Sequence, residues 1–549
     1  MVVVHVGGIR YHTRLKADTA AHSTRESAEY AAALLETGVD WRIRRAKDIL
    51  HAVLNLQDAD ESSPTYGIWP WFLEEPLEAM SPPDWNWADF IGTHLAQILC
   101  RRADHLDFSL GTAVESALRH AAGSIIRRDV TMRYTNIAIM GTYVTVMAGT
   151  ILEDDGILEY GRNRLRRFQA FTEDWGGFAE YNSPTYTIVS LAELTRMLRD
   201  FPDEADRRIV QDLHDRAWRE IAVHWHAFSG QWSGPHSRSY QTLLLPEILG
   251  FIRRGVGSRL PQQKKYTPAV QEILLPICCP DALLPYFEGK NPATTHRQRI
   301  VDGEPALEGV SFLAKKFALA SAERGTFWNQ SRVLTAYSHN SNGPTAWHVR
   351  VLRNGYDYSS ANLISTQLGP RILGAICFAT DGGNVHCSLD RIQDASVEAS
   401  DWRLRFQCHG SVGLPELPGT FSTQQILSFK LADDVVVSMR IPWVGFGFFK
   451  PRWELVAEEE GVGVDMILYH GLSRHFVFNP AFPCAIGLAV TANTPGELEG
   501  VHAEIAGERL NLEWPVSKGE ILQVSSPLFA SSEAEITAFA QDLKSRRGL

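Results

Sequence analysis

The stretch Trp175-Gly-Gly-Phe-Ala-Glu-Tyr-Asn-Ser-Pro-Thr-Tyr186 ends one run of helical character and begins another. Gly, Asn, Ser and Pro form turns, and Pro184 suits the first turn of a new helix, where its missing N–H has no helical partner to lose. A second stretch, Gly234-Pro-His-Ser-Arg-Ser-Tyr240, has the same character. Both stretches join tyrosine to carboxylate, imidazole or guanidinium groups. We therefore expect two functional loops on a helical scaffold.

Outward from these loops, the first half of the chain has the apolar spacing of amphipathic helices. Ile137, Met140, Val144 and Ala148 recur at intervals of three to four residues, which is typical of a buried helical stripe. The helical hairpins repeat without clear sequence identity, and a ring of them, an (α/α) toroid, is the natural closed arrangement. Helices are expected over 24–37, 41–56, 86–102, 110–127, 136–152, 158–171, 184–199, 204–226 and 238–254.

From residue 311 onward the pattern changes to short alternating or β-branched runs. Turns such as Arg353-Asn-Gly355 and Asp381-Gly-Gly383 separate these runs, as in an antiparallel sandwich. Strands are expected over 345–352, 371–378, 404–408, 426–431, 435–441 and 464–468. At 549 residues the chain is too long for one core. The sequence thus predicts an α+β multidomain protein, with an (α/α) toroid catalytic domain at 1–300 and an antiparallel β-sandwich domain at 301–549.

The charge and the termini limit the partners that we expect. The chain has 53 Lys and Arg against 64 Asp and Glu, a net charge of −11 that is spread along its length, so we expect no nucleic-acid partner. It has no run of about 18 apolar residues, so we expect no membrane span. Without a signal-peptide pattern at residue 1, we expect a cytoplasmic protein if this N-terminus is native, and a secreted one if a signal peptide was removed. The sequence leaves the oligomeric state open.

Four short motifs carry a resemblance to a known group of enzymes. They are Asn86-Trp87-Ala-Asp-Phe-Ile-Gly92, Tyr134-Thr-Asn136, Gly177-Phe-Ala-Glu-Tyr-Asn-Ser-Pro-Thr-Tyr186, and Trp347-His348-Val-Arg-Val-Leu-Arg-Asn-Gly355 with Asp381-Gly-Gly383. Together with a toroid followed by a β-domain, they resemble the uronic-acid polysaccharide lyases of the heparinase II/III-like, alginate lyase-like and chondroitin/hyaluronate lyase-like families. The resemblance implies a lyase that acts on an acidic oligo- or polysaccharide, with Asn136 where these families keep a carboxylate-binding Asn. Those families often place His after this Asn, whereas this chain has Ile137.

A uronate lyase must remove the weakly acidic C5 proton and neutralise the adjacent carboxylate. The Asn136 amide and the Arg238 guanidinium suit the carboxylate. Either of two tyrosines, helped by His236, could move protons, and Glu180 could orient one of these groups. Two of these residues could instead have structural roles. Asn136 could cap a helix, and Arg238 could form a salt bridge with Glu180. The expected catalytic set is Tyr186, Tyr240, His236, Asn136, Arg238, Glu180 and Tyr181.

An aromatic loop over residues 66–87 could form sugar subsites, because flat rings stack on sugar faces. One rival reading is a glycoside hydrolase that uses Glu180 and a second carboxylate. Another is a carbohydrate-binding protein without catalysis, in which the aromatic loop alone meets the sugar. The expected substrate-binding set is Trp69, Trp71, Trp85, Asn86, Trp87, Tyr134 and Asn182.

The histidines and cysteines match no compact metal motif. Seven cysteines without metal-type spacing predict reduced thiols. We therefore expect no cofactor and no metal. The alternative is a structural divalent metal in the β-domain, for which His348, His386 and His409 are candidate ligands.

Overall fold

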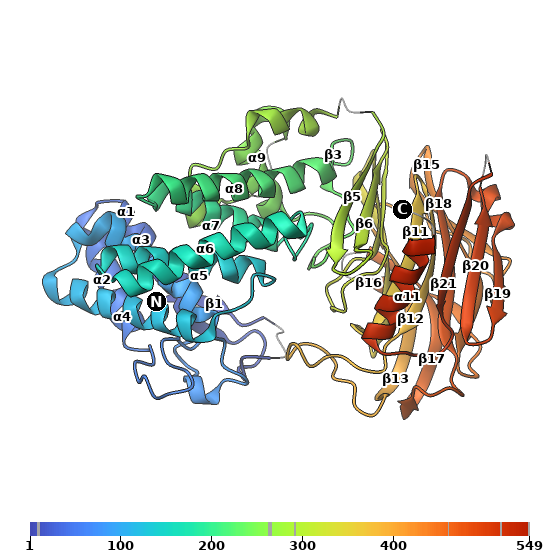
Figure 1. Cartoon of the computed structure of the whole chain (residues 1–549), viewed down its shortest axis with the longest axis horizontal. Helices are drawn as coiled ribbons and strands as arrows, with labels where there is room; N and C mark the ends of the chain where they lie inside the picture. The colour runs from blue at the N-terminus through green and yellow to red at the C-terminus, as the bar shows by residue number, and fades with distance from the viewer. Residues whose placement is uncertain (8–10, 262–265, 290–291, 459–460, 517–518, 547–549) are drawn as a thin grey trace.

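The computed structural model describes residues 1–7, 11–261, 266–289, 292–458, 461–516 and 519–546. Figure 1 shows helices on one side of the molecule and β-sheets on the other. This order confirms the predicted fold class, a helical (α/α) toroid followed by an antiparallel β-sandwich domain. Among the described helices, none has both the length and the apolar composition needed to cross a bilayer.

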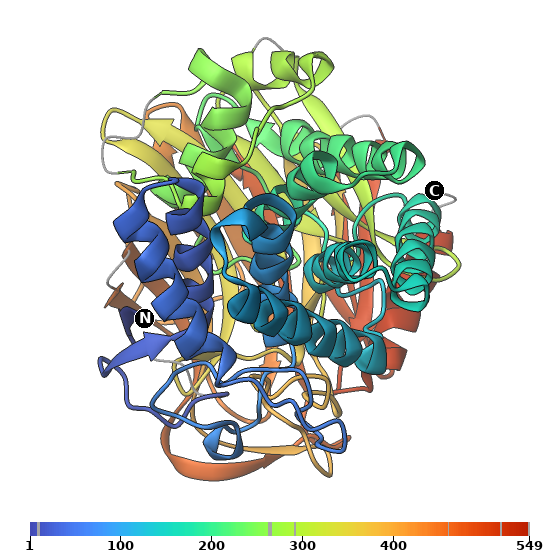
Figure 2. The same cartoon turned by 90° about the vertical axis from the view of Figure 1, so that its left-hand side faces the viewer.

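The helical domain consists of antiparallel hairpins formed by consecutive helices. α1, α3, α5 and α7 also contact one another in that order and form the inner layer, while α2, α4, α6 and α8 lie outside. Figure 2 shows this double layer in front of the sheets. The hairpins are α1 (Thr24–Glu36) with α2 (Asp40–Leu54), α3 (Trp87–Arg102) with α4 (Phe108–Arg128), α5 (Thr135–Ile151) with α6 (Asp155–Trp175), and α7 (Tyr186–Asp200) with α8 (Glu204–His224).

The inner helix α5 is buried on nearly every side. Its sequence is apolar around the whole circumference, and every residue from Thr135 to Gly149 is buried, as expected of a helix inside a protein. Gly149 lets α6 approach closely, since a Cβ at this position would lie 2.3 Å from the backbone nitrogen of Leu158. The α5–α6 hairpin is therefore a fixed frame for the loops at its ends.

The β-domain contains three stacked sheets rather than the two of a simple sandwich. The largest has the strand order β16-β17-β13-β9-β8-β7-β6-β5, the second β11-β12-β18-β15-β14 and the smallest β19-β20-β21. The strands of the largest sheet are β5 (Thr294–Val301), β6 (Leu307–Leu313), β7 (Ala318–Ala322), β8 (Leu334–Asn340), β9 (Gly343–Arg353), β13 (Ser396–His409), β16 (Arg452–Glu458) and β17 (Gly461–Val477), with β10 (Tyr356–Asp357) beside β9. Those of the other two are β11 (Ala361–Leu368), β12 (Arg371–Phe378), β14 (Ile426–Ala432), β15 (Val435–Phe446), β18 (Cys484–Ala492), β19 (His502–Ala506), β20 (Arg509–Pro515) and β21 (Ile521–Pro527).

Two apolar cores hold these layers together. Trp347, Trp402 and Phe429 belong to the core between the two larger sheets. The second core joins the middle sheet to the smallest sheet and to the C-terminal helix α11 (Glu533–Arg546), and contains Trp514 and Ile536. The runs expected to be strands all lie within observed strands, because their apolar residues form these cores.

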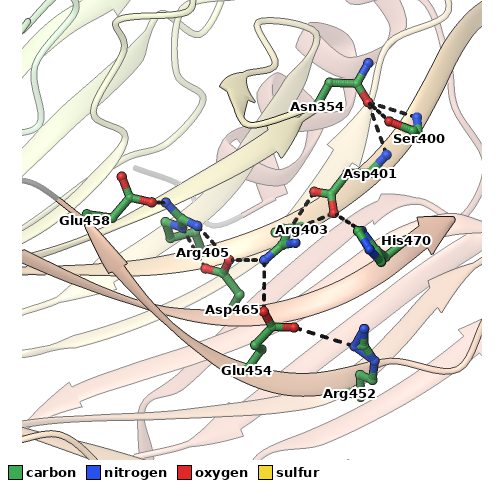
Figure 3. Close-up of polar contacts among 10 residues, drawn as sticks. All are labelled: Asn354, Ser400, Asp401, Arg403, Arg405, Arg452, Glu454, Glu458, Asp465 and His470. Carbon is green, nitrogen blue, oxygen red and sulfur yellow. Dashed lines mark hydrogen bonds and ion pairs between the residues drawn. The ribbon is translucent and has the colours of Figure 1, made fainter. Parts of the chain in front are cut away.

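Charged residues on β13, β16 and β17 form a polar network, which Figure 3 shows. Asp465 is fully buried and accepts two hydrogen bonds of 2.7 Å from Arg405 and one of 3.0 Å from Arg403. Arg403 also pairs with Asp401, at 2.7 Å. The outer members of the network, such as Glu454, are exposed. Asp465 is thus the buried centre of an otherwise solvated cluster.

The expected helix over 238–254 is wrong in its first half. The helix α9 begins only at Pro246 and ends at Val256. Residues 236–239 instead pair with the β-domain: His236 and Arg332 exchange backbone hydrogen bonds of 3.0 and 2.9 Å, and the Ser239 N–H donates to the Gln330 carbonyl at 2.8 Å. Backbone groups engaged with another domain are not available for helical hydrogen bonds.

Candidate active site

A cavity of about 480 Å³ lies between the helical domain and the β-domain. Both loops singled out in the sequence reach its wall. Its lining residues are Thr131, Arg133, Tyr134, Ala179, Glu180, Ser237 and Arg238 from the helical domain, and Thr326, Trp328, Val385 and His386 from the β-domain.

The first loop, residues 176–185, is shaped by two backbone positions with positive φ. Gly176 ends α6 in the left-handed conformation, with φ of 81°, and its N–H donates to the Thr172 and Glu173 carbonyls. Asn182 has φ of 47° and is fully buried; its side-chain amide donates to the Ser233 and Pro235 carbonyls at 2.8 Å each. Asn182 therefore fastens the first loop to the second, and is not placed to bind substrate as expected.

Hydrogen bonds and aromatic rings hold the Arg238 side chain in the cavity wall. Its Nη1 donates to Glu180 Oε1 at 3.2 Å, and its Nε and Nη2 donate to Gln330 Oε1 at 3.1 and 2.9 Å. The guanidinium carbon lies 4.2 Å from the centre of the Tyr186 ring and 4.6 Å from that of Trp328, within range of cation–π attraction. These contacts fix the plane of the guanidinium and leave part of its five N–H donors for a ligand.

Tyr186 and Tyr240 form a hydroxyl pair beside Arg238. The two oxygens are 2.8 Å apart, and Tyr240 is 47% exposed. Burial raises the pKa of Tyr186, and this outweighs the lowering effect of Arg238. At neutral pH Tyr186 therefore keeps its proton and can donate it in a hydrogen bond to Tyr240.

Glu180 lies between the start of α5 and Arg238. Burial raises its pKa, although Arg238 and the backbone N–H groups of Thr135 and Asn136 favour the carboxylate. Asn136 itself is buried in the first turn of α5 and is not among the residues that line the cavity. Tyr134 does line it: burial raises its pKa to about 12, and its hydroxyl accepts a hydrogen bond of 3.0 Å from the Asn86 amide.

Two expected catalytic residues lie elsewhere. His236 is 1% exposed, with Nδ1 at 2.7 Å from the Asn182 carbonyl and Nε2 at 3.3 Å from the Tyr337 hydroxyl. Burial lowers its pKa to about 4. Tyr181 is also buried and packs against Ile300 of the β-domain. Both side chains belong to the domain interface, so the expectation that they act on substrate is corrected.

The aromatic loop is mostly core rather than a sugar platform. Trp69 is fully buried and donates to the Val53 carbonyl at 3.0 Å, and Trp87 is buried with its N–H on Thr24. Trp71 stacks on Trp87 and also meets the His12 ring. Trp85 donates to the Pro64 carbonyl. None of these four tryptophans lines the cavity.

The structure adds residues that sequence reasoning missed. Trp328 and Gln330 come from a β-domain loop and hold Arg238 from the far side of the cleft. Thr326-Phe-Trp-Asn-Gln330 lies between two strands and has no local signal of function. Only its contacts with a loop about ninety residues earlier in the chain give it a role.

Of the candidate metal ligands, His348 and His409 form a buried pair. Their rings stack with centroids 5.4 Å apart, and His348 Nε2 is 3.0 Å from the Thr242 hydroxyl. Within the described parts of the chain, neither belongs to a group of three or more side chains that could hold a metal ion.

Glu220 joins the first loop to the β-domain and gives stability a pH dependence. It accepts hydrogen bonds from the Asn182 N–H, from Thr187 and from Gln298 on β5, and burial raises its pKa from 4.5 to about 7. The folded protein holds the proton of the Glu220 carboxyl more tightly than the unfolded chain does. The contribution of this protonated group to stability is therefore full below about pH 4.5 and is lost as pH rises through about 7.

Glu220→Gln should therefore remove that part of the pH dependence. Urea unfolding at several pH values is expected to show the wild type losing stability relative to Glu220→Gln between about pH 4.5 and 7. The exposed Glu159→Gln serves as the control and should follow the wild type. A stability difference between Glu220→Gln and the wild type that stays constant with pH would contradict the assignment.

Comparison with known protein families matches one part of the chain. A family model described as a domain of unknown function, DUF8769, matches residues 7–247. No curated protein matches the chain.

Among solved structures, those that the chain resembles include polysaccharide lyases. A crystal structure of heparinase III has 9% identity and a TM-score of 0.40, with 89% of this chain and 80% of that chain covered. The chondroitin AC lyase of Streptomyces coelicolor A3, in complex with chondroitin sulphate, has 10% identity and a TM-score of 0.47, covering 92% and 80%. A heparan sulfate lyase from Pedobacter heparinus has 9% identity and a TM-score of 0.32, covering 80% and 75%.

Proposed function

We propose that the protein is a lyase that cleaves a uronic-acid-containing oligo- or polysaccharide by β-elimination. The observation that carries this proposal is the fixed guanidinium of Arg238 beside the hydrogen-bonded hydroxyls of Tyr186 and Tyr240 at the cleft. It provides one positive charge for a carboxylate and two groups that can hold or move a proton, which are the two needs of the reaction.

In this proposal the substrate carboxylate binds the free N–H groups of Arg238, and the exposed Tyr240 removes the C5 proton. The electron pair of the C5–H bond forms the C4–C5 double bond as the bond from C4 to the glycosidic oxygen breaks. The proton now on Tyr240 passes to the departing oxygen. Tyr186, which keeps its own proton, donates a hydrogen bond that stabilises the Tyr240 phenolate.

Glu180 and Asn136 act as positioning residues in this scheme. Glu180 holds one edge of Arg238, opposite Gln330. Asn136 is buried at the start of α5, next to Glu180. Through Glu180 and Arg238 it would influence the position of the substrate carboxylate.

To test this, a set of uronic-acid glycans is incubated with the full chain, and the reaction is monitored by ultraviolet absorbance and by a reducing-end assay. We expect both signals to rise together, since β-elimination creates an absorbing unsaturated uronate with each new end. Tyr240→Phe should abolish both. New reducing ends without the absorbance would refute the lyase and indicate a hydrolase. Among the cavity-lining residues, Glu180 supplies the carboxylate, and a hydrolase needs a second one.

A further inference from the structure

A β-domain loop crosses the cleft and meets the N-terminal segment of the chain. This loop connects β12 to β13 and contains His386 and Cys387. The His386 ring packs edge-on against the Tyr11 ring, with centroids 5.4 Å apart, and lies 5.3 Å from Trp328. Figure 1 shows the loop reaching toward the blue N-terminal region. Parts of the chain about 375 residues apart thus meet at the rim of the cavity.

At this contact, three potential metal ligands come together. His12, His386 and Cys387 each offer a donor atom, and these atoms lie within 4.8 Å of one another. In the described residues this is the one group of three or more His, Cys, Asp or Glu side chains that could hold a metal ion. Zinc bound by imidazole nitrogen and thiolate sulfur at 2.0–2.3 Å needs its ligands roughly 3.5 Å apart, so a small inward movement would complete the site.

The imidazole of His12 is oriented by a hydrogen bond to the ring nitrogen that would not bind the metal, as is usual for metal-ligating histidines. Its Nδ1 donates to the Pro82 carbonyl at 2.7 Å, which leaves Nε2 as the nitrogen available to a metal. His12 has φ of 68° and is held there by backbone hydrogen bonds exchanged with Ser81. A left-handed conformation is uncommon for a residue other than glycine. The surrounding structure therefore fixes both the backbone and the ring.

The position of the His386 imidazole and the charges around it also bear on metal binding. His386 Nδ1 accepts a hydrogen bond of 3.1 Å from the Ser388 N–H and lies 2.8 Å from the Ser388 hydroxyl, so this ring is also fixed in place. Asp84, held by a hydrogen bond from Trp71, places negative charge close to both His386 and Cys387. A carboxylate in this position favours a bound cation, whereas Arg238, whose positive charge also acts on His386, opposes it.

We propose that His12, His386 and Cys387 form a zinc site that fastens the N-terminal segment to the β-domain across the cleft. Two imidazoles and a thiolate are ligands that suit zinc, and a fourth, tetrahedral position remains for water. Because His386 also lines the cavity, the ion would sit at its rim. This site is independent of the proposed lyase reaction.

The test is metal titration of the full chain after removal of bound metal with a chelator. We expect one zinc per chain, and cobalt(II) in its place should give a thiolate-to-cobalt absorption band. Cys387→Ser should remove the band and weaken zinc binding by more than about 100-fold, which exceeds the usual effect of losing a residue behind a ligand. Cys100→Ser, which alters an exposed cysteine of α3, should behave like the wild type.

A thermal-unfolding measurement separates the site from adventitious binding. Zinc should raise the unfolding midpoint of the wild type and of Cys100→Ser, but not of Cys387→Ser or His12→Gln. Both ligand variants should keep the wild-type circular dichroism spectrum. The proposal is overturned if the wild type binds no stoichiometric zinc, or if Cys387→Ser and Cys100→Ser bind it equally.

Discussion

Turnover of an acidic glycan is expected to fall by about 10²–10³-fold in Arg238→Ala, the typical loss when one fixed group that stabilises developing charge is removed. The effect should be this large because the guanidinium is already held by Glu180, Gln330 and the two flanking rings before substrate arrives. Arg238→Lys should recover only part of the activity. Its ammonium restores the charge but cannot bond Glu180 and Gln330 as a planar fork does. Initial rates under saturating and limiting substrate provide the measurement.

A purely structural role for Arg238 would give a different outcome. Arg238→Ala leaves Glu180, whose side chain is only 12% exposed, without its counter-charge, so some loss of stability is expected as well. Adding Glu180→Gln removes that charge, and the double variant should regain stability while staying inactive. Activity that returns together with stability would show that Arg238 only supports the fold. Arg259→Ala, which breaks an ion pair away from the cavity, is the matched control and should keep full activity.

Asp465→Ala should destabilise the β-domain by about 3–5 kcal/mol, the usual cost of removing one partner from a buried ion pair. The fully buried carboxylate is the shared partner of Arg403 and Arg405, as Figure 3 shows. Without it, the positive side chains of Arg403 and Arg405, two residues apart on β13, lie close together with less negative charge to balance them. The measurement is the free energy of unfolding from urea titration, followed by tryptophan fluorescence.

Glu454→Gln tests whether burial or charge causes that effect. Glu454 belongs to the same network but its side chain is 44% exposed, so the expected change is within about 1 kcal/mol. Equal losses for Asp465→Ala and Glu454→Gln would contradict the view that the buried centre carries the stability. A small loss in both would mean that the existing partners Asp401 and Glu458 are enough to balance Arg403 and Arg405.

The fold could be predicted from sequence wherever a local pattern and the tertiary structure agree. The apolar stripe of α5 and the β-branched runs of β12 and β15 follow the periods of helix and strand, and burial stabilises those same residues. The third sheet and α11 were not foreseen. The start of the segment 238–245 was predicted wrongly because the backbones of Ser239 and of the preceding His236 bond to residues 330–332, which no local pattern can indicate.

The candidate site was foreseen in its loops but only partly in its side chains. Glu180, Arg238, Tyr186 and Tyr240 do come together, since turn-forming residues place both loops at one end of the helices. His236 and Asn182 have equally polar side chains and occur in the same loops, yet both are buried: His236 contacts Tyr337 of the β-domain, and Asn182 bonds to carbonyls of the second loop. Which way a loop side chain points depends on the partner domain, and so Trp328 and Gln330 could not be found beforehand.

The backbone bridge between residues 236–239 and 330–332 bears on how such a protein can be re-engineered. Arg238 belongs to one domain, but its position is set by hydrogen bonds to the other. The two domains are therefore not interchangeable modules. A chimaera that takes its β-sheets from another protein would inherit the helices intact and still misplace the guanidinium, unless the donor also supplied the pairing at 330–332.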